Sequence, residues 1–413
     1  MNLTDEARSR DAADPLAGFR DRFTLPDGVI YLDGNSLGAL PKATGPRLAR
    51  LVQEEWGSGL IRSWNAVPNG NPGWVDLPQR VGAKIAPLIG AAAHEVIACD
   101  STSVNLFKLI AAALMLDPGR RVVLSEPSNF PTNLYMTAGL ERQGLCELRL
   151  VPRDQLAQAL RQEDVALLLL THVHYRTGAM HDVAALTSAA HDAGVPVLWD
   201  LSHSAGAVEL SLSEQGVDFA VGCGYKYLNG GPGAPAFAYV AQRHHERLAQ
   251  PLTGWFGHAA PFAFTDDYQP APNITRMLAG TPPVLGLTGL EVGVDLMAEI
   301  GIARLAAKSR ALSAFFLQCL EREGAELECV SPSDPAQRGS QLSFRHEHAY
   351  AVCQALIARG VIGDFRAPDV LRLGFAPAYL RFADMAAAAR HLAEVLGSEE
   401  WRDDAFETRA AIT

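Results

Sequence analysis

One lysine stands apart in this chain because of the residues around it. Lys226 lies in the glycine-rich stretch 222–233 (GCGYKYLNGGPG), directly after the apolar run Phe219–Val221, and it is the only charged residue of that stretch. An apolar setting penalises an ammonium group and lowers the pKa of lysine, which leaves an amine able to form a Schiff base with an aldehyde. The alternative interpretation is a surface lysine in a glycine-rich turn.

A carboxylate ends an earlier apolar segment. Val195–Asp200 (VPVLWD) is apolar up to its last residue, which is typical of a buried parallel strand. Ligands of open α/β sheets bind outside the carboxyl ends of the strands, so Asp200 and Lys226 are expected to face one cavity. A lysine for an aldehyde and a carboxylate for a pyridinium nitrogen together fit pyridoxal phosphate. Taken alone, Asp200 is equally consistent with a helix cap.

Hydroxyl groups precede a helical pattern in the first half of the chain. Ser101, Thr102 and Ser103 come shortly before the helical run Phe107–Leu116, where free backbone amides make an anion site. They are equally consistent with ordinary capping residues. Phe130, at the start of the FPTN segment 130–133, offers a ring that could stack on a pyridine face, or it is a core phenylalanine in a turn.

Further motifs, in order along nearly the whole chain, resemble those of the kynureninase family. They are YLDGNSLG (31–38), SWN (63–65), FPTN (130–133), WDLSHSAG (199–206), GYKYLNGGPG (224–233) and GTPP (280–283). The lysine motif and the Asp200-x-x-His203 element resemble fold type I pyridoxal phosphate enzymes of the class V aminotransferase group. The Asn-Ser loop near the N-terminus and the paired glycines after Lys226 narrow the resemblance to kynureninase.

The resemblance implies an activity. Family members use pyridoxal phosphate to hydrolyse L-kynurenine, and in some cases 3-hydroxykynurenine, to anthranilate or 3-hydroxyanthranilate and L-alanine. This reaction belongs to the kynurenine pathway of tryptophan catabolism and NAD biosynthesis. Trp64 and the Gly280-Thr281 pair resemble bacterial members, which generally favour kynurenine.

The resemblance also implies roles for individual residues. The catalytic residues are Lys226, which takes the cofactor and moves protons, Tyr225 as proton donor or acceptor, and Asp200 at the pyridine nitrogen. The cofactor-binding residues are Thr102, Ser103, Phe130, Pro131, Thr132, Asn133, Thr171, Asp200, His203, Tyr225, Lys226, Trp255 and Thr281. Trp255 and Thr281 reach the neighbouring subunit's cofactor in this family, so a homodimer with shared active sites is implied.

The substrate-binding residues implied by the resemblance are Ser36, Trp64, Gly280, Thr281 and Arg372. Arg372 takes the substrate α-carboxylate, for which a bidentate guanidinium is well shaped. Its alternative interpretation is an arginine at the end of a strand on a solvated edge. Arg345 and Arg366 are the other candidates for this role.

The order of apolar runs predicts an α/β fold. Strand-like runs such as Arg121–Leu124 and Val165–Leu170 alternate with helical patterns, which indicates a mainly parallel sheet. The resemblance implies seven strands in a large domain and a smaller α+β domain. The expected division is an N-terminal segment 1–70 that packs with the small domain, a pyridoxal phosphate-binding domain 71–285 and a small domain 286–413. Other expected elements are a helix over Lys42–Trp56, a helical region Val284–Leu320 broken near Gly301, strands Gln341–Phe344 and Val370–Leu373, and a helix over Met385–Leu396.

Composition limits the partners and the compartment. A net charge of −11 over 413 residues argues against nucleic acid or an anionic membrane surface as partner. The six cysteines have no paired spacing, which favours reduced thiols in the cytoplasm. The first residues lack the apolar core of a signal peptide, and no apolar stretch is long enough to span a bilayer.

Other functions and a metal site also have to be considered. The chain could be another class V enzyme, an aminotransferase or a cysteine desulfurase, for which Cys329 is the one loose candidate nucleophile, or a non-catalytic pyridoxal phosphate-binding protein. His172, His174 and His181 could form a zinc site, but a loop over a cofactor explains them as well, so no metal is expected. The segment His244–Glu246 is interpreted as a solvated helix face.

Overall fold

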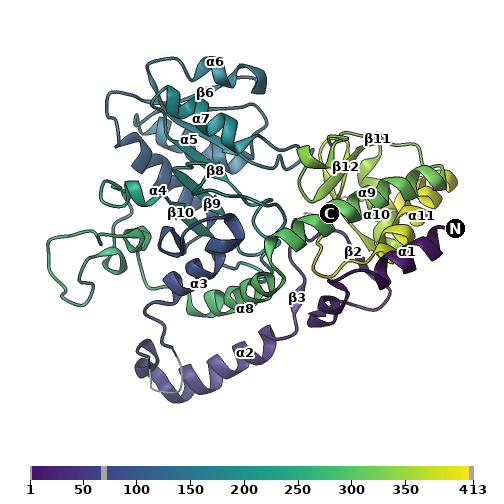
Figure 1. The fold of residues 1–413 in the computed structure, drawn as a ribbon, viewed down its shortest axis with the longest axis horizontal. Coiled ribbons are helices and arrows are strands. Elements are labelled where there is room, and N and C mark those ends of the chain that lie inside the picture. Colours follow the sequence, from purple (N-terminus) through teal and green to yellow (C-terminus); the bar gives the residue numbers. More distant parts are fainter. Residues whose placement is uncertain (1, 67–71, 409–413) are drawn as a thin grey trace.

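The structure, a computed structural model, describes residues 2–66 and 72–408. Its larger sheet has seven strands in the order β4-β10-β9-β8-β7-β5-β6, with helices on both sides (Figure 1). These strands are β4 (Val96–Ala98), β5 (Val122–Ser125), β6 (Glu147–Leu150), β7 (Val165–Thr171), β8 (Val197–Asp200), β9 (Phe219–Gly222) and β10 (Phe237–Val240). Only β10 runs antiparallel to its neighbours in this sheet. The predicted α/β class with a mainly parallel seven-stranded sheet is confirmed.

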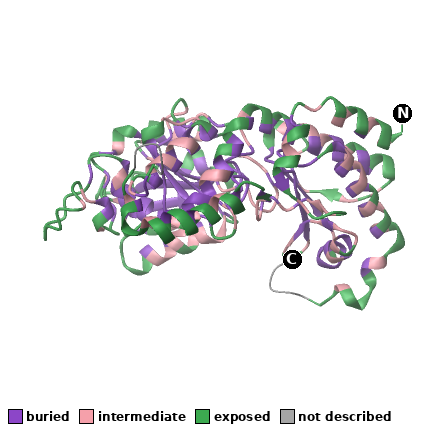
Figure 2. Cartoon of the chain, turned by 90° about the horizontal axis from the view of Figure 1, so that it is seen from below, coloured by how far each residue is buried: buried purple, intermediate pink, exposed green. Residues whose placement is uncertain are grey.

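The central strands are apolar because both of their faces are covered. Every residue of β7, β8 and β9 is buried, and Figure 2 shows buried residues concentrated along this sheet. The polar residues of these strands stand at their carboxyl ends, where Thr171 of β7 is paired in register with Asp200 of β8. The sheet therefore delivers two polar side chains to the edge at which α/β proteins bind ligands.

Each helix that covers the large sheet starts with a polar or proline residue or directly follows one. They are α3 (Leu77–Ile85), α4 (Thr102–Leu114), α5 (Pro131–Arg142), α6 (Leu156–Ala159), α7 (Val183–Asp192) and α8 (Val284–Ile300). Ser101 caps α4 by accepting a hydrogen bond from the Val104 amide, and Asp182 caps α7 through the Ala185 amide. Such caps satisfy amides that have no partner within the helix. They fix where α4 begins, directly after the end of β4.

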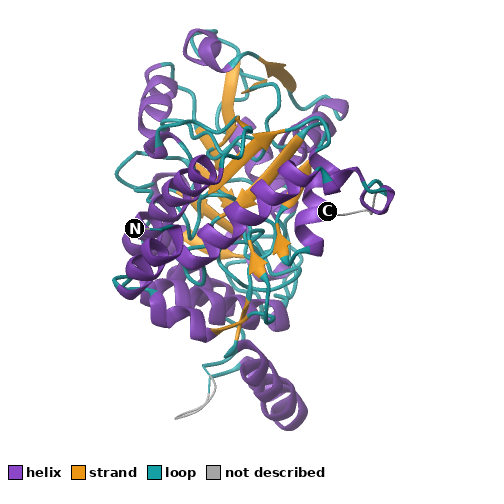
Figure 3. Cartoon of the chain, turned by 90° about the vertical axis from the view of Figure 1, so that its right-hand side faces the viewer, coloured by secondary structure: helices purple, strands orange, loops and turns teal. Residues whose placement is uncertain are grey.

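A second sheet lies in the C-terminal part of the chain and is antiparallel. Its order is β11-β12-β15-β14, formed by β11 (Glu328–Cys329), β12 (Gln341–Arg345), β15 (Val370–Gly374) and β14 (Asp364–Arg366). Its helices are α9 (Ile302–Glu323), α10 (Ala349–Ala358) and α11 (Phe382–Ser398), and Figure 3 shows helices packed around the strands. Within the described residues, no helix combines the length and the apolar character that a membrane span requires.

The N-terminal segment packs against this second sheet and its helices. It contains α1 (Leu3–Ala12), β1 (Phe23–Thr24), β2 (Ile30–Tyr31), β3 (Leu40–Pro41) and α2 (Thr44–Arg50). The strand β2 pairs in parallel with β13 (Val361–Ile362), and the carboxylate of Asp11 accepts hydrogen bonds from the first amides of α11. Residues at opposite ends of the sequence therefore fold as neighbours.

Several predicted elements differ from the structure in their bounds. The helix expected over Lys42–Trp56 begins at Thr44 and continues beyond Arg50 as a wider π-helical segment, η2 (Leu51–Gly59), and the two together project from the body (Figures 1 and 3). The helix expected from Phe107 begins earlier, at Thr102, because Ser101 caps it. The break near Gly301 is confirmed, since this glycine has a φ of 85° between α8 and α9.

The interpretation of 244–246 as a solvated helix face is wrong. Nε2 of His244 bonds the buried Asp218 carboxylate at 2.7 Å, and His245 is buried, with Nε2 2.9 Å from the Val240 carbonyl. The polarity of this segment does not show that His244 bonds Asp218, the residue before β9, or that His245 bonds a backbone carbonyl.

Three glycines on one face of α8 let the lysine loop, residues 223–235, lie directly on that helix. A methyl group added at Gly293 would lie 2.2 Å from the Leu228 carbonyl oxygen, and one at Gly286 would lie 3.0 Å from Pro235. Gly289 faces the Gly230 carbonyl in the same way. The spacing of three and four residues places all three on one side of the helix. The position of the lysine loop is therefore fixed by close contact with the glycine backbone of α8.

We expect Gly293→Ala to destabilise the protein by about 1–3 kcal/mol, because the added methyl has no room and must displace the lysine loop. Gly139→Ala is the matched control, since Gly139 is also inside a helix but has no atom within 4 Å of the added methyl. That control should gain about 0.5–1 kcal/mol from the better helix former. Thermal unfolding of both variants measures the difference, and equal melting temperatures would contradict the close packing.

Candidate active site

Lys226 lies on the loop after β9 and is 8% exposed. Its Nζ is 5.8 Å from the ring centroids of both Phe130 and Tyr225. Within residues 2–66 and 72–408, its amine has no hydrogen bond or ion pair. Burial lowers the pKa of Lys226, and the charges of Arg372 and Arg366 lower it further, against the opposite effects of Cys223 and Asp200. The lowered pKa makes the neutral amine, the form that a nucleophile or base requires, easier to reach than for a lysine in water.

Asp200 is 2% exposed and belongs to a hydrogen-bonded network at the strand ends. Its Oδ1 accepts from the Ser202 amide at 2.9 Å, and its Oδ2 accepts from Asn133 Nδ2 at 3.3 Å. The same Asn133 nitrogen lies 2.9 Å from Thr171 Oγ1, whose hydroxyl donates to Asn129 Oδ1 at 2.5 Å. These bonds hold the carboxylate in one orientation without supplying a cation, which leaves it available to a positively charged ring nitrogen.

Two helix N-termini lie at the same edge of the sheet. Thr102 and Ser103 form the first turn of α4 after β4, and Pro131 and Thr132 form the first turn of α5 after β5. All four residues are half-buried. The free amides and the positive end of a helix dipole make such a turn suitable for a phosphate group.

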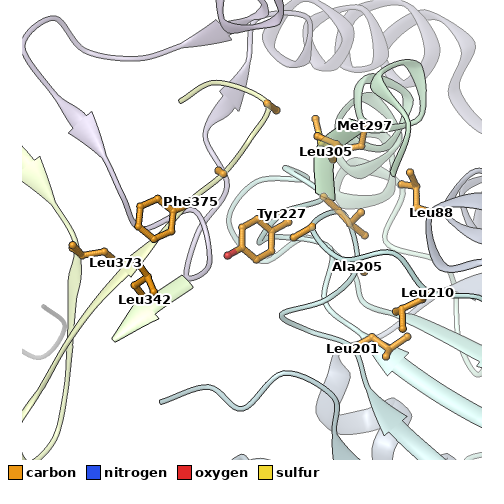
Figure 4. Close-up of a cluster of buried hydrophobic side chains, with 14 of the residues drawn as sticks. Leu88, Leu201, Ala205, Leu210, Tyr227, Met297, Leu305, Leu342, Leu373 and Phe375 are labelled. Atoms are coloured by element: carbon orange, nitrogen blue, oxygen red, sulfur yellow. The ribbon is translucent and has the colours of Figure 1, made fainter. Parts of the chain in front are cut away.

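Contacts to the second sheet close the site from the other side. The hydroxyl of Tyr227 donates to the Ser340 carbonyl at 2.8 Å, and Figure 4 shows this side chain facing Leu342 and Phe375. His203 Nδ1 lies 3.0 Å from Gln341 Oε1, an amide oxygen that can only accept, so this nitrogen carries the proton. Burial, followed by the charge of Lys226, holds the pKa of His203 well below its usual range, so the imidazole is neutral.

Tyr225 keeps its proton. Burial raises the pKa of its hydroxyl, and the neighbouring Cys223 and Asp200 raise it further. The backbone beside it is fixed, because the Tyr225 carbonyl accepts a hydrogen bond from the Gly38 amide at 2.8 Å. A methyl group at Gly38 would lie 2.3 Å from the Lys226 carbonyl oxygen, so a glycine is needed where the N-terminal loop crosses the lysine. Tyr225 thus offers a protonated hydroxyl, on a ring whose centroid is 5.8 Å from the Lys226 amine.

Arg372 is 1% exposed in β15 and is paired with Asp364. Its Nε donates to Asp364 Oδ1 at 2.8 Å, and its Nη2 donates to Asp364 Oδ2 and, at 2.9 Å, to Ser36 Oγ. Its Nη1 donates to the Tyr175 carbonyl at 2.7 Å. With its amide oxygen turned toward the guanidinium, Asn35 also accepts from Nε at 3.0 Å. Ser36 and Arg372, both predicted to bind substrate, are thus brought together.

Two further charged residues, Asp33 and Arg366, lie beside Asp364 and Arg372. We call these four residues the arginine–aspartate cluster. Arg366 Nη2 pairs with Asp364 Oδ2 at 2.7 Å. Burial raises the pKa of Asp364, but the charge and hydrogen bonds of Arg372, together with Arg366 and Ser36, outweigh this effect, and the pKa lies below its usual value. Burial, and then the negative charge of Asp364, raise the pKa of Asp33 to about 7.

Four of the predicted residues lie apart from Lys226 within this chain. Trp64 packs on Trp74 and Phe256, with ring centroids at 5.6 and 5.9 Å. Trp255, Gly280 and Thr281 are exposed on the connection between β10 and α8. In the described part of the chain, no hydrogen bond, ion pair or ring contact joins these four to the lysine. The structure of one chain does not bring them into the site.

The histidines considered for zinc have protein partners. His172 bonds Ser204 Oγ at 2.8 Å, His181 bonds Glu126 at 2.7 Å, and His174 bonds the Ser128 carbonyl at 3.0 Å. In the chain from 2 to 66 and from 72 to 408, no group of three or more His, Cys, Asp or Glu side chains is arranged to hold a metal ion. Burial raises the pKa of Cys329, which disfavours the thiolate that a cysteine nucleophile needs.

The residues fit pyridoxal phosphate. In the described residues, a buried amine without a partner, a buried carboxylate without a cation, an aromatic ring near the amine and two helix N-termini at one sheet edge match its aldehyde, ring nitrogen, ring face and phosphate. Oδ1 of Asn133 is buried without a hydrogen-bond partner in the described residues, and Nδ2 of the same side chain bonds Asp200, so a polar ligand beside Asp200 could satisfy this oxygen. Fold and site together define a pyridoxal phosphate enzyme of fold type I.

Comparison with known proteins gives the family. Residues 305–392 match the model of the kynureninase C-terminal domain. A kynureninase of Burkholderia mallei (strain SAVP1) is 50% identical over 423 residues, covering 100% of both chains, and one of Deinococcus radiodurans is 51% identical, covering 94% of this chain and 95% of its own. The chain belongs to the kynureninase family.

Solved structures support the fold at much lower identity. An apo cysteine desulfurase from Thermococcus onnurineus NA1 superposes with a TM-score of 0.76 at 17% identity, covering 96% of this chain and 99% of its own. A cysteine desulfurase from Escherichia coli gives a TM-score of 0.76 at 20% identity, covering 93% and 98%. These structures share the architecture, while the family follows from the sequence relatives.

The sequence interpretation missed several polar residues of the site. Asp33 and Asn35 lie inside the YLDGNSLG motif but received no role, and Asp364, Asn129 and Gln341 were not considered. Asp364 stands two residues before Arg366 and eight before Arg372. A carboxylate close to two arginines of adjacent strands is a signal that could have found the cluster.

The pKa of Asp33 predicts a pH dependence of anion binding. Below about pH 7 Asp33 is neutral, and above it a second negative charge stands beside Asp364. An amino acid carboxylate should therefore bind more weakly as the pH rises through 7, with a limit of about tenfold per pH unit. Titration of the pyridoxal phosphate-loaded protein with L-alanine, followed by absorbance, measures this dependence. Asp33→Asn should flatten this component, and identical profiles for both proteins would contradict the assignment.

Proposed function

We propose that this chain hydrolyses L-kynurenine to anthranilate and L-alanine. The observation that carries the proposal is the 50% identity to kynureninases over the full length, which spans both sheets and every predicted site motif. The reaction adds one water across the Cβ–Cγ bond: hydroxide goes to the aroyl carbon and forms the carboxylate of anthranilate, and a proton goes to Cβ and forms the methyl of alanine. The related substrate 3-hydroxykynurenine would give 3-hydroxyanthranilate.

We assign the cofactor contacts to the residues at the carboxyl edge of the large sheet. Lys226 would hold the cofactor aldehyde, Asp200 the ring nitrogen and Phe130 the ring face. Thr171, His203, Pro131 and Asn133 would line the pocket, and Thr102, Ser103, Thr132 and Tyr225 would contact the phosphate. When bound, pyridoxal phosphate supplies an electron-withdrawing ring that stabilises negative charge on the substrate carbons.

The protein groups then divide the proton transfers and the binding. The lowered pKa of Lys226 lets its amine act as a base at the substrate Cα, and the protonated hydroxyl of Tyr225 can donate. Arg372 binds the α-carboxylate. Ser36, Trp64, Gly280 and Thr281 would bind the aryl ketone, with preference for kynurenine.

Cysteine desulfuration is the alternative suggested by the structural neighbours, but it has weak support here. Those neighbours share 16–20% identity, which reflects the fold. The candidate nucleophile Cys329 sits in the edge strand β11 with a raised pKa. A transaminase activity or a non-catalytic role has no observation in its favour.

The assembly, domains and compartment form part of the proposal. We propose a homodimer with shared active sites, because Trp255, Phe262 and Phe264 are 39, 57 and 76% exposed on the connection between β10 and α8.

We divide the chain into an N-terminal segment 1–70, a large domain 71–285 and a small domain 286–413, with the boundary at 70 outside the described residues. We place the enzyme in the cytoplasm, in tryptophan catabolism and NAD biosynthesis, since all six cysteines are free thiols.

Wild-type protein should produce fluorescent anthranilate from L-kynurenine, and Lys226→Ala should lower turnover by about 10²–10⁴-fold or more, the range for loss of a positioned proton-transfer group. Chromatography should find equal amounts of alanine. Release of sulfide from cysteine without anthranilate from kynurenine would instead support desulfuration. Full turnover by Lys226→Ala would remove the assigned role of the lysine.

Mixing two inactive variants tests the shared sites. Lys226→Ala chains and chains carrying Trp255→Ala with Thr281→Ala should regain activity after subunit exchange, because a heterodimer holds one intact composite site. The expected recovery is about a quarter of the wild-type activity for random exchange of equal amounts, as half of the dimers then hold one good site of two. Exchange demonstrated by mass spectrometry without recovery would contradict sharing.

A further inference from the structure

Two guanidinium groups, and not one, meet at the carboxylate of Asp364. Arg372 and Arg366 both reach its Oδ2, and both donate to the hydroxyl oxygen of Ser36, at 2.9 and 3.3 Å. Two positive charges facing one ionised carboxylate leave the group with one net positive charge while Asp33 is neutral. Such an excess needs an anion, and the substrate carboxylate is one.

Arg372 is poorly placed to meet that anion alone. Of its five N–H groups, four donate to Asp364, Ser36 and the Tyr175 carbonyl. Its side chain is 1% exposed. A new ligand can therefore reach this guanidinium only through its remaining N–H or by displacing a protein acceptor. The buried ion pair with Asp364 therefore holds the Arg372 guanidinium in one position.

Arg366 is more exposed than Arg372 and has more N–H groups without a partner among the described residues. Its side chain is 33% exposed. Its two terminal nitrogens donate hydrogen bonds to the Phe365 carbonyl and to Ser36 Oγ, and Nη2 also forms the ion pair with Asp364. The Nε–H and one Nη1–H have no partner among the described residues. The charges of both arginines also lower the pKa of Lys226 and of His203, so both act within electrostatic range of the reactive amine.

We propose that Arg366 is a second binding residue for the substrate α-carboxylate, with Arg372 held by Asp364 as a fixed anchor and Arg366 supplying the accessible N–H groups. This inference rests on the proposed function and deepens it. It assigns Asp364 the role of a positioning residue, since Asp364 pairs with both guanidiniums. It also makes the site selective for a carboxylate over a neutral amide, because the amide leaves the net charge without a counter-ion.

The test compares a carboxylate with its amide on the pyridoxal phosphate-loaded protein. Dissociation constants of L-alanine and L-alaninamide are measured by absorbance for wild type, Arg366→Gln and Arg366→Lys. In Arg366→Gln the preference for alanine over the amide should fall by roughly tenfold or more, as expected for loss of a charge-assisted hydrogen bond. Arg366→Lys should restore part of that preference, because it keeps the charge.

Arg345→Gln is the matched control. Arg345 ends the neighbouring strand β12, is 50% exposed and pairs with Glu328 and Asp369, outside the cluster. Its removal changes the net charge by the same amount and should leave the ligand preference unchanged. An equal loss of preference in Arg345→Gln would overturn the proposal, because the effect would then be one of overall charge.

Kinetics with L-kynurenine supply the second readout. Arg366→Gln should raise KM by roughly tenfold or more with a smaller change in kcat, since the interaction is made on binding. An unchanged alanine-to-amide preference in Arg366→Gln would overturn the proposal even if KM rose, because Arg366 would then act only by supporting Asp364. If wild type failed to cleave kynurenine, the proposed function would fall, while the alanine and alaninamide titrations would still decide the role of Arg366.

Discussion

The removal of one amine from water is the constraint on which the rest of this structure depends. Lys226 is buried and has no counter-ion among the residues that the structure describes, and burial of an unpaired cation is costly unless the group gives up its proton. The surroundings must therefore exclude water and also withhold any carboxylate that would restore the charge. Asp200 approaches closely enough to influence the amine but is fixed by Ser202 and Asn133 in another direction. The lysine loop meets these demands by lying on bare backbone, against the glycines of α8 on one side and Gly38 on the other.

The second demand is that the site must attract the carboxylate of an amino-acid substrate, so it must keep a net positive charge before the substrate binds. The arginine–aspartate cluster meets this demand with an uneven charge balance: one strong carboxylate for two guanidiniums, and a second carboxyl whose ionisation is suppressed. Asp364 is surrounded by donors, whereas Oδ1 of Asp33 is buried without a partner among the described residues. The two chemically identical side chains differ because, among the described residues, Asp364 forms ion pairs with both arginines and Asp33 forms none with either.

Much of the large sheet and its chemistry could be predicted from local sequence. The runs Val165–Thr171 and Val197–Asp200 are short, apolar and end in polar residues, and a buried parallel strand imposes that pattern. The fold class and family are therefore confirmed, whereas the roles of the individual site residues remain predictions. The contact between Ser36 and the cluster could not be predicted from the sequence, because Ser36 and Asp364 meet only through tertiary folding across 328 positions. The glycine face of α8 escaped notice for a related reason: its spacing has meaning only once the partner loop is known.

The distance along the chain between the two halves of the substrate site has a consequence for synthesis in the cell. Ser36 is made early, but its partners Asp364 and Arg372 lie 328 and 336 residues later. A nascent chain therefore emerges from the ribosome with the lysine loop translated and the strands that close it still missing. The large sheet can assemble first, since its contacts lie within the earlier part of the chain. The substrate pocket can form only after residues 364–372 have been synthesised and have folded back onto the loop that carries Ser36.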